Sequence, residues 1–507
     1  MEVIKLRLRL NLKKSENKKG QKDISSLHPC NLFDNKIKKY IEYYGDDLSL
    51  VCKNYKHALN IFLPIIAIIV IFGVLRLKLL LLSAIPLALI AYLYPLLYVW
   101  SRAEEHKKVI NTEAPFIAII AYANSLVDKG LNHTLRELSQ IKELKVPKVE
   151  LDFLDKMTTY MNMSFAKALE RRAIVHNGDL LGKLYNSYLS ALELGITIRD
   201  RLKDVLRELL EELKNTYKAY VDKTAELSEL EFALFLLVPM ILIGFSFTFK
   251  VSLFELFSPL LLVPLIIFLI SSIQPSIGYE IKYGRYMYGI FAIPAIFLIP
   301  GLNLEYKVFA LIGIILAMSY FVYDQITLAN ELEQSLPILL KEVSEYLKIG
   351  YSVQSAILRV KLSSKRVSKV IETFAKRPEL INSPSKLFNV TFKLLLIVAK
   401  TGTSSTALEE LANSISEIVY SKSNLIRQLR LFDVLNVITP VMLWLSFEMF
   451  AKMSTFTIPG LAVISAYSLA SNIIFSKISR FTILYFPSIL LTSIIIAILS
   501  VLPPTFL

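Results

Sequence analysis

Residues 79–100 read LLLLSAIPLALIAYLYPLLYVW, and this stretch decides what kind of fold the chain has. It carries no charged side chain and is long enough to cross a bilayer, which takes about 20 mostly apolar residues. A second apolar stretch, 59–75, precedes it, and only Arg76-Leu77-Lys78 separates the two. Such a pair is typical of a helical hairpin that enters and leaves a membrane.

The composition of the whole chain agrees with a membrane protein. Of 507 residues, 54% are hydrophobic and 20% are charged, and the mean hydropathy is +0.51. With 16 Gly and 2 Cys, the chain is neither collagen-like nor a disulfide scaffold. The two cysteines, Cys30 and Cys52, have no Cys or His partner at metal-ligand spacing, which predicts free thiols. We expect a polytopic membrane protein.

Nine stretches are long and apolar enough to be spans. The fifth is the weakest, because Pro294 and Pro300 interrupt it. The nine lie at 59–75, 79–100, 232–249, 254–273, 287–301, 306–323, 432–450, 458–475 and 481–501.

The net charge of the chain is +14, and the distribution of its basic residues predicts the orientation of these spans. With the N-terminus inside, only five of the 57 Lys and Arg residues fall in spans or outer turns, namely Arg76, Lys78, Lys250, Lys307 and Lys452. An excess of basic residues marks the cytoplasmic side, so the charge indicates a membrane orientation rather than nucleic acid binding. We expect a plasma membrane location, with the tail 1–58 and segments 101–230 and 324–431 in the cytoplasm and the C-terminus outside.

The two long polar segments, 101–230 and 324–431, are both predicted to be helical bundles. Their apolar residues recur at helical spacing and show no strand alternation. They also share landmarks in the same order: a Pro near the start, a Gly about 14 residues later and a second Gly before a long helix. These landmarks are Pro115, Gly130 and Gly195 in the first segment, and Pro337, Gly350 and Gly402 in the second. The order predicts a duplicated domain.

The domain plan follows from the spans and the two bundles. Both copies face the same way, because four spans make up each unit, and this argues against inverted transporter repeats. The predicted parts are the tail 1–58, hairpin 59–100, bundle 101–230, hairpins 231–273 and 287–323, bundle 324–431, hairpin 432–475 and a ninth span 481–501.

This arrangement resembles the type II secretion system F family, in particular its archaeal branch of archaellum and pilus assembly platforms (FlaJ/TadC-like). The resemblance covers about 59–475 and depends on the two bundles, the spans that follow each, and the Pro and Gly landmarks. It implies duplicated F-type domains in an all-α membrane protein without catalysis or cofactor. It also implies a cytoplasmic secretion ATPase and pilin- or archaellin-like subunits as partners, and a homo-oligomer.

No complete catalytic or metal-binding motif is present. Gly178-Asp179-Leu180-Leu181-Gly182-Lys183 has one residue too few for a phosphate-binding loop and lacks the Ser or Thr after Lys, so it indicates a helix break. The five histidines are scattered. A transporter or channel is the alternative function, but its pathway needs acids at mid-depth, and Glu231 and Asp433 both lie near span ends. Asp433 and Asn436 form either a polar face toward another span or an interfacial pair.

Basic clusters on the bundles are the candidate docking residues for the ATPase. A solvated surface or attraction to anionic lipid headgroups is the alternative reading of the same clusters. The second bundle has 15 basic and 10 acidic residues, whereas the first has 20 of each, so an acidic motor surface should prefer the second. The candidates are Arg171, Arg172, Lys365, Arg366, Lys369, Lys376 and Arg377.

Overall fold

The computed structural model describes most of the chain, and every named element in that part is a helix. One isolated antiparallel bridge joins Tyr279 and Ser385. The residues that the structure describes are 34–45, 50–60, 63–64, 78–249, 252–276, 279–282, 296, 304–378, 381–400, 405–451 and 460–501.

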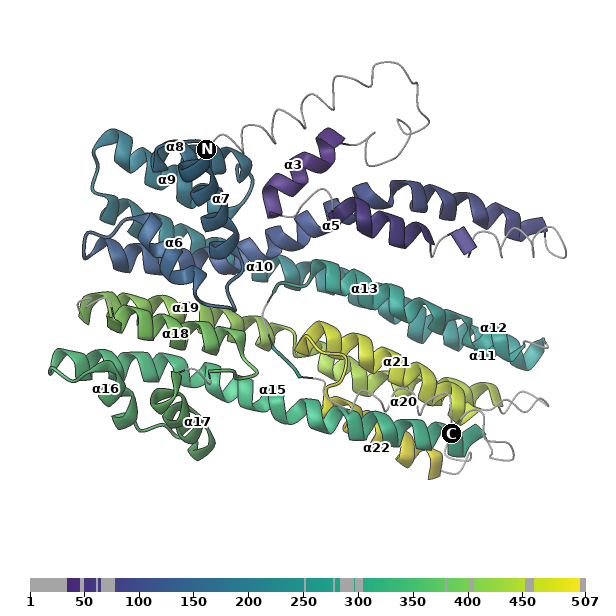
Figure 1. Cartoon of the computed structure of the whole chain (residues 1–507). Helices are drawn as coiled ribbons and strands as arrows, with labels where there is room; N and C mark the ends of the chain where they lie inside the picture. The colour runs from purple at the N-terminus through teal and green to yellow at the C-terminus, as the bar shows by residue number, and fades with distance from the viewer. Residues whose placement is uncertain are drawn as a thin grey trace, which may run out of the picture.

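The first bundle is built on two long helices that pack together, α5 (Lys78–Ser125) and α10 (Ile198–Phe232). Four shorter helices lie between them in sequence: α6 (Leu131–Ser139), α7 (Val146–Tyr160), α8 (Phe165–Val175) and α9 (Leu180–Leu194). The first helix of the described residues, α3 (Asp34–Tyr44), packs on α5. All of these lie in the upper part of Figure 1.

The second bundle has a related helix order. Its long helices, α15 (Leu304–Lys348) and α19 (Ser405–Gln428), also pack together, and α16 (Val353–Arg359), α17 (Lys365–Lys376) and α18 (Lys386–Lys400) lie between them in sequence. Among the described residues the second bundle has three such shorter helices, whereas the first has four. The two bundles lie against each other (Figure 1), with α19 in contact with both α5 and α10.

The landmark residues occupy partly different places from those predicted. Pro115 and Pro337 lie inside continuous helices rather than at a helix start, each ten or eleven residues before the helix ends. The reason is that α5 and α15 continue from the apolar stretches without a break. Gly195 ends α9 in the left-handed conformation, with φ 65°.

The remaining glycine landmarks do not form an equivalent pair. Gly350 has φ 95°, but in the first bundle the left-handed residue at this turn is Asp128. Asp128 and Gly350 each precede the next helix by three residues, whereas Gly130 is the residue before α6 and has φ −79°. Gly402 lies outside the described residues.

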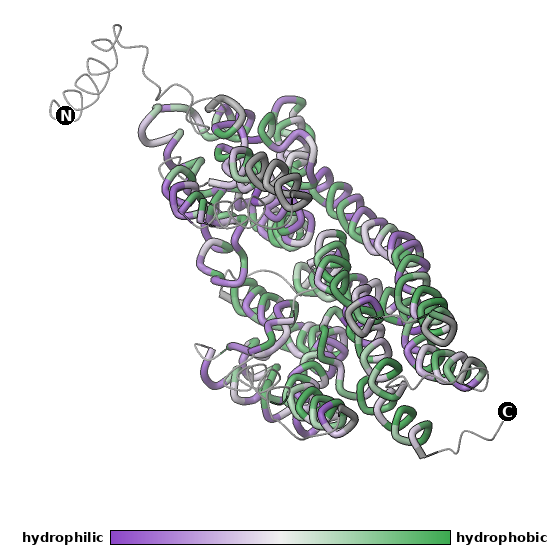
Figure 2. Tube along the Cα trace, turned by 90° about the vertical axis from the view of Figure 1, so that its right-hand side faces the viewer, coloured by the Kyte–Doolittle hydropathy of each residue, from purple (hydrophilic) through white to green (hydrophobic). Residues whose placement is uncertain are grey.

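Five helices of the described residues are long and apolar enough to cross a membrane. They are Ile198–Phe245, Glu255–Ile273, Tyr306–Lys348, Thr406–Met449 and Gly460–Arg480. They coincide with the predicted spans 232–249, 254–273, 306–323, 432–450 and 458–475. Figure 2 looks onto the end of the molecule where these helices finish, and hydrophobic residues colour much of the tube there.

The other four predicted spans have different outcomes. Spans 59–75 and 287–301 lie almost entirely outside the described residues. Span 79–100 is helical as part of α5, and the side chains of its residues 79–90 lie outside the described part of the chain. The last span begins later than predicted, because Phe481 has φ 62° and the helix α22 (Phe486–Val501) starts only after this turn.

Long helices connect the two bundles directly to the helices that are apolar enough to cross a membrane. α10 continues through the π-helical turn η2 (Ala233–Leu237) into α11 (Val238–Thr248), and α15 is a single helix throughout. α19 is separated from α20 (Leu431–Ala451) only by a two-residue turn. Because these connections are helical, a displacement of a bundle is carried into the apolar helices without a flexible linker.

The helix α21 (Gly460–Arg480) is the centre of the apolar part. In the apolar 18-residue stretch of this helix 78% of the residues are buried, against 17% in the corresponding stretch of the helix Glu255–Ile273. α21 contacts α20, α22, α15, α10, η2 and α13 (Val263–Ile273). Its many Ser, Ala and Gly residues allow this close packing.

Cys52 is disulfide-bonded in this structure. The prediction of a free thiol is therefore wrong at that position. Sequence spacing could not reveal the bond, because a pairing depends on which residues the fold brings within reach.

Candidate functional site

Four of the seven candidate docking residues lie on the helix α17 (Lys365–Lys376), and a fifth, Arg377, follows it directly. Ser364 begins the helix, and its hydroxyl accepts a hydrogen bond from the amide of Val367 at 3.4 Å. The apolar side of α17 is buried through Val367, Ile371, Phe374 and Ala375. Lys365, Arg366, Lys369, Lys376 and Arg377 are all exposed. The amphipathic pattern therefore fixes which side of α17 the bundle covers and which side faces water.

Two of these five cations are already paired within the chain. Arg366 donates to Asp324 at 2.8 Å, and Lys376 pairs with Glu372 at 2.5 Å. Both pairs are exposed, so each contributes little to stability and exchanges readily with water. No ion pair between described residues involves Lys365 or Lys369, which lie one turn apart on the same face of α17.

Arg171 and Arg172 do not form the surface patch that the sequence predicts. Arg171 is exposed, but Arg172 is fully buried. The Arg172 guanidinium forms a bidentate pair with Glu150 of α7 (Nη2 to Oε1 2.5 Å, Nε to Oε2 3.0 Å) and lies over the Phe153 ring at 4.2 Å. Adjacent residues on a helix point about 100° apart, which is why one faces water and the other the core.

Arg172 belongs to a buried polar cluster, which we call the α7–α9 cluster: Glu150, Arg172, His176 and Asp179. The His176 ring lies between two carboxylates, with Nδ1 2.7 Å from Asp179 and Nε2 3.1 Å from Glu150. The α7–α9 cluster also holds α3, since Tyr43 donates to Asp179 at 2.6 Å and Arg172 Nη1 donates to the carbonyl of Glu42 at 2.8 Å.

Asp179 begins the helix α9 within the segment 178–183, whose sequence resembles that of a phosphate-binding loop. Its carboxylate accepts hydrogen bonds from the amides of Leu181 and Gly182, both at 3.0 Å, and thereby caps α9. A phosphate at this helix end would need those same amides. The helix break predicted at 178–183 is confirmed, and the protein's own carboxylate occupies the anion position.

The charges of the α7–α9 cluster stabilise one another. Burial alone would raise the pKa of Glu150, but Arg172 and then His176 lower it from 4.5 to about 2. Burial lowers the pKa of His176, yet Glu150 and Asp179 raise it above its ordinary value overall. Because the pKa of Glu150 is lower in the folded protein, its stabilising contribution is present above about pH 4.5 and is lost as the pH falls toward 2.

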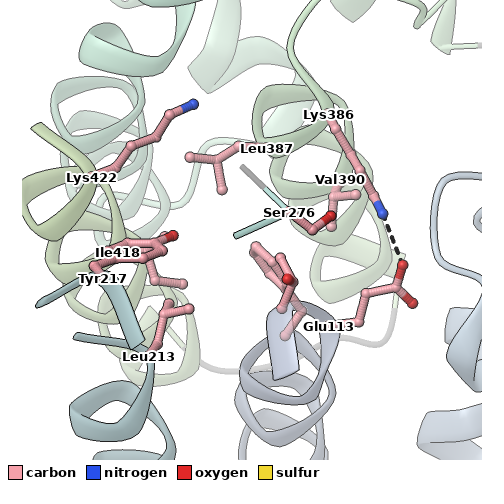
Figure 3. Close-up of a pocket in the computed structure, with 11 residues that line it drawn as sticks. Glu113, Leu213, Tyr217, Ser276, Lys386, Leu387, Val390, Ile418 and Lys422 are labelled. Carbon is pink, nitrogen blue, oxygen red and sulfur yellow. Dashed lines mark hydrogen bonds and ion pairs between the residues drawn. The ribbon is translucent and has the colours of Figure 1, made fainter. Parts of the chain in front are cut away.

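A second buried group of charges lies between the two bundles (Figure 3). Glu113 of α5 pairs with Lys386 of α18 at 2.8 Å, and its other carboxylate oxygen accepts from the amides of Lys145 and Val146 at 2.9 Å. The neighbouring cavity has room for about 30 Å³, enough for a water molecule but not for a substrate. The site is therefore an interface and not a ligand pocket.

Further ion pairs cross the same interface. Lys393 of α18 pairs with Glu143 at 2.5 Å, and Lys203 of α10 pairs with Glu410 of α19 at 3.3 Å. These residues are not among those that the sequence singles out. The only local signal was that Glu113 precedes Pro115 by two positions, and nothing in the sequence marks its partner Lys386.

Asp433 and Asn436 do form a polar face toward other spans, one of the two readings of the sequence. Asp433 accepts from Arg480 at 2.5 Å and from Ser479 at 2.7 Å. Asn436 donates to Ser488 at 3.0 Å. Interhelical hydrogen bonds of this kind hold membrane helices together.

Among the described residues, no group of three or more His, Cys, Asp or Glu side chains is placed to hold a metal ion. No protein-family model, curated protein or solved structure matches the chain.

Proposed function

We propose that this protein is a non-enzymatic membrane platform of an archaeal type IV pilus-like, archaellum or type II secretion machine. It would couple a cytoplasmic secretion ATPase to the extraction and assembly of pilin-like subunits. The observation that carries the proposal is the continuity of α10–η2–α11, of α15 and of α19–α20, which connect two packed bundles to apolar helices. A motor that pushes on the bundles would move these helices.

The finer architecture is part of the same proposal. The two bundles would be copies of one F-type domain, which is supported by paired long helices flanking a series of shorter ones in both. Nine spans, cytoplasmic bundles and an outer C-terminus would then follow from the apolar stretches and the basic residues. The homo-oligomer belongs to the proposal through the family resemblance alone.

The exposed face of α17 is the proposed contact with the ATPase. Reversing Lys365, Arg366 and Lys369 together to Glu should weaken binding of an acidic motor on the order of 100-fold at low salt, since each exposed pair contributes about 0.2–1 kcal/mol and reversal replaces attraction by repulsion. At high salt the difference should shrink because ions screen exposed charges. Binding of the purified motor to the protein in detergent, across a salt series, measures this.

A matched control places the same charge change on the other bundle. Lys142, Lys148 and Lys167 are exposed residues of the first bundle, and reversing all three to Glu should leave motor binding nearly unchanged. Equal losses in the two triple variants would indicate a general charge effect, and an unchanged affinity in the α17 variant would exclude this face as the contact.

The proposed topology has its own test. Thr159 and Ser363 are exposed on the first and second bundles, so Thr159→Cys and Ser363→Cys provide labelling sites. In intact cells a membrane-impermeant maleimide should label neither residue, and after permeabilisation it should label both. Labelling of Ser363→Cys in intact cells would contradict a cytoplasmic second bundle and with it the platform function.

A membrane transporter or channel is the second candidate. It is favoured by the polar residues between α20, α21 and α22, where Asn472 donates to Ser488 at 2.9 Å and to Thr492 at 2.6 Å. These groups bond one another, however, as interhelical contacts do in packed bundles. Solute or ion flux through vesicles that contain only this protein would favour the transporter.

A further inference from the structure

Glu231 is a buried carboxyl without a cationic partner beside the apolar helices. It lies at the end of α10, two residues before η2, and is 1% exposed. Its carboxyl lies close to the Ser471 side chain of α21, and Oε1 has no hydrogen-bond partner. No ion pair between described residues involves it. A carboxylate left in this state is costly, so the position calls for a bound positive charge.

The tertiary structure places Glu231 beside the interior of α21. α10 runs antiparallel to α21, since Tyr220 donates to the carbonyl of Ile478 at 3.1 Å and the rings of Phe235 and Tyr467 are 6.4 Å apart. Glu231 therefore lies beside Ser471, about 14 Å along α21 from Arg480 at a rise of 1.5 Å per residue. Glu231 adjoins the end of the predicted span 232–249, as the sequence indicates, and the helices α20 and α21 that pack near it continue past it.

Oxygen atoms from α20 and α21 lie near this position. The Ser471 hydroxyl is 3.4 Å from that of Thr439 on α20. Asn436 and Ser468, each one turn from these residues, have buried side-chain oxygens without a partner. All four are at most 3% exposed. Carboxylate, hydroxyl and amide oxygens are the ligands that hard cations prefer.

We propose that Glu231, Ser471 and Thr439 form an intramembrane site for a monovalent cation, either a proton on the carboxyl or Na⁺ held among the oxygens. One carboxylate balances one positive charge, whereas a divalent ion usually has more acidic ligands. The site lies next to η2, and π-helical turns within α-helices are frequent at functional positions. Binding of the cation at this site would determine how α10 packs on α21.

The charged groups on the elements around Glu231 do not supply this positive charge. On α20 and α21 the nearest cation in sequence to Ser471 is Lys477, six residues or about 9 Å along the axis. Arg480 is paired with Asp433. The titratable and charged side chains of these two helices are Asp433, Glu448, Tyr467, Lys477 and Arg480, and on the neighbouring turns of α10 they are Tyr220, Asp222, Lys223, Glu226 and Glu229.

A hydrophobic carbodiimide tests the proposal, because it reaches carboxyls in apolar surroundings and reacts only with their protonated form. The full chain in vesicles would be treated with dicyclohexylcarbodiimide over a pH series, and adducts would be located by mass spectrometry. We expect Glu231 to be the main adduct, with the yield falling about tenfold per pH unit above the midpoint of its titration. Protection by NaCl but not by choline chloride assigns the site to Na⁺, and no effect of NaCl assigns it to the proton.

Two variants control the assignment. Glu231→Gln keeps the size of the protonated acid and should remove the main adduct, whereas Glu229→Gln, two positions earlier and exposed, should retain it. Mapping on the unmodified chain keeps the test valid if the Gln variant does not fold. No adduct on Glu231 at any pH, or equal yields on Glu229 and Glu231, overturns the proposal. The outcome is independent of motor binding.

Discussion

An Arg172→Met variant should lose about 3–5 kcal/mol of stability in the first bundle, which is the usual cost of removing one partner from a buried ion pair. The methionine fills part of the space but leaves Glu150 as a buried carboxylate with only His176 and Tyr185 as polar neighbours. The contact of Arg172 with the carbonyl of Glu42 is lost as well, so α3 should dock less firmly. Thermal unfolding of the purified protein measures the loss of stability. Limited proteolysis of the folded protein between α3 and α9 measures how firmly α3 is docked.

Arg171→Met is the matched control for this prediction. The substitution is chemically identical and one residue earlier, but Arg171 is exposed, so we expect a change within about 0.5 kcal/mol. A double variant, Glu150→Gln with Arg172→Met, should recover part of the loss because no unpaired carboxylate remains. If the two Met variants unfold alike, the burial of Arg172 in the α7–α9 cluster is contradicted.

A Gly182→Ala variant should destabilise the same bundle by about 1–3 kcal/mol or more, as expected when an atom is forced into a packed site. A Cβ at Gly182 would lie 2.0 Å from the carbonyl oxygen of His176. That oxygen belongs to the backbone, so it cannot move aside as the end of a flexible side chain could. The turn from 176 to 179 would have to shift, which would separate His176 from its two carboxylates.

Gly178→Ala provides the comparison, since a Cβ at that position meets nothing within 4 Å. We expect Gly178→Ala to unfold at nearly the same temperature as the unmodified protein and to keep α3 protected from protease. A Gly182→Ala protein that is as stable as Gly178→Ala would show that the approach between α9 and the preceding turn is looser than described.

Local sequence patterns determined the class of this protein and much of its helical content. Apolar runs predicted five spans that the structure contains as long apolar helices. The helical nature of the two polar segments, 101–230 and 324–431, also followed from their own residues, because helical spacing acts within a few positions. The same holds for the helix break at 178–183, whose residues do not fit the spacing of a phosphate-binding loop.

The contacts that give individual residues their roles were decided only by the tertiary structure. Arg171 and Arg172 are alike in sequence, yet the packing of α8 on α7 buries one and leaves the other in water. The pair Glu113–Lys386 joins residues 273 positions apart, and no local pattern encodes such a partner. Glu231 lies at the end of an apolar run, but its depth depends on how far α20 and α21 extend beside it. Hydrophobic periodicity acts over single helices and so can be read from the chain, whereas burial and charge pairing depend on which helices meet.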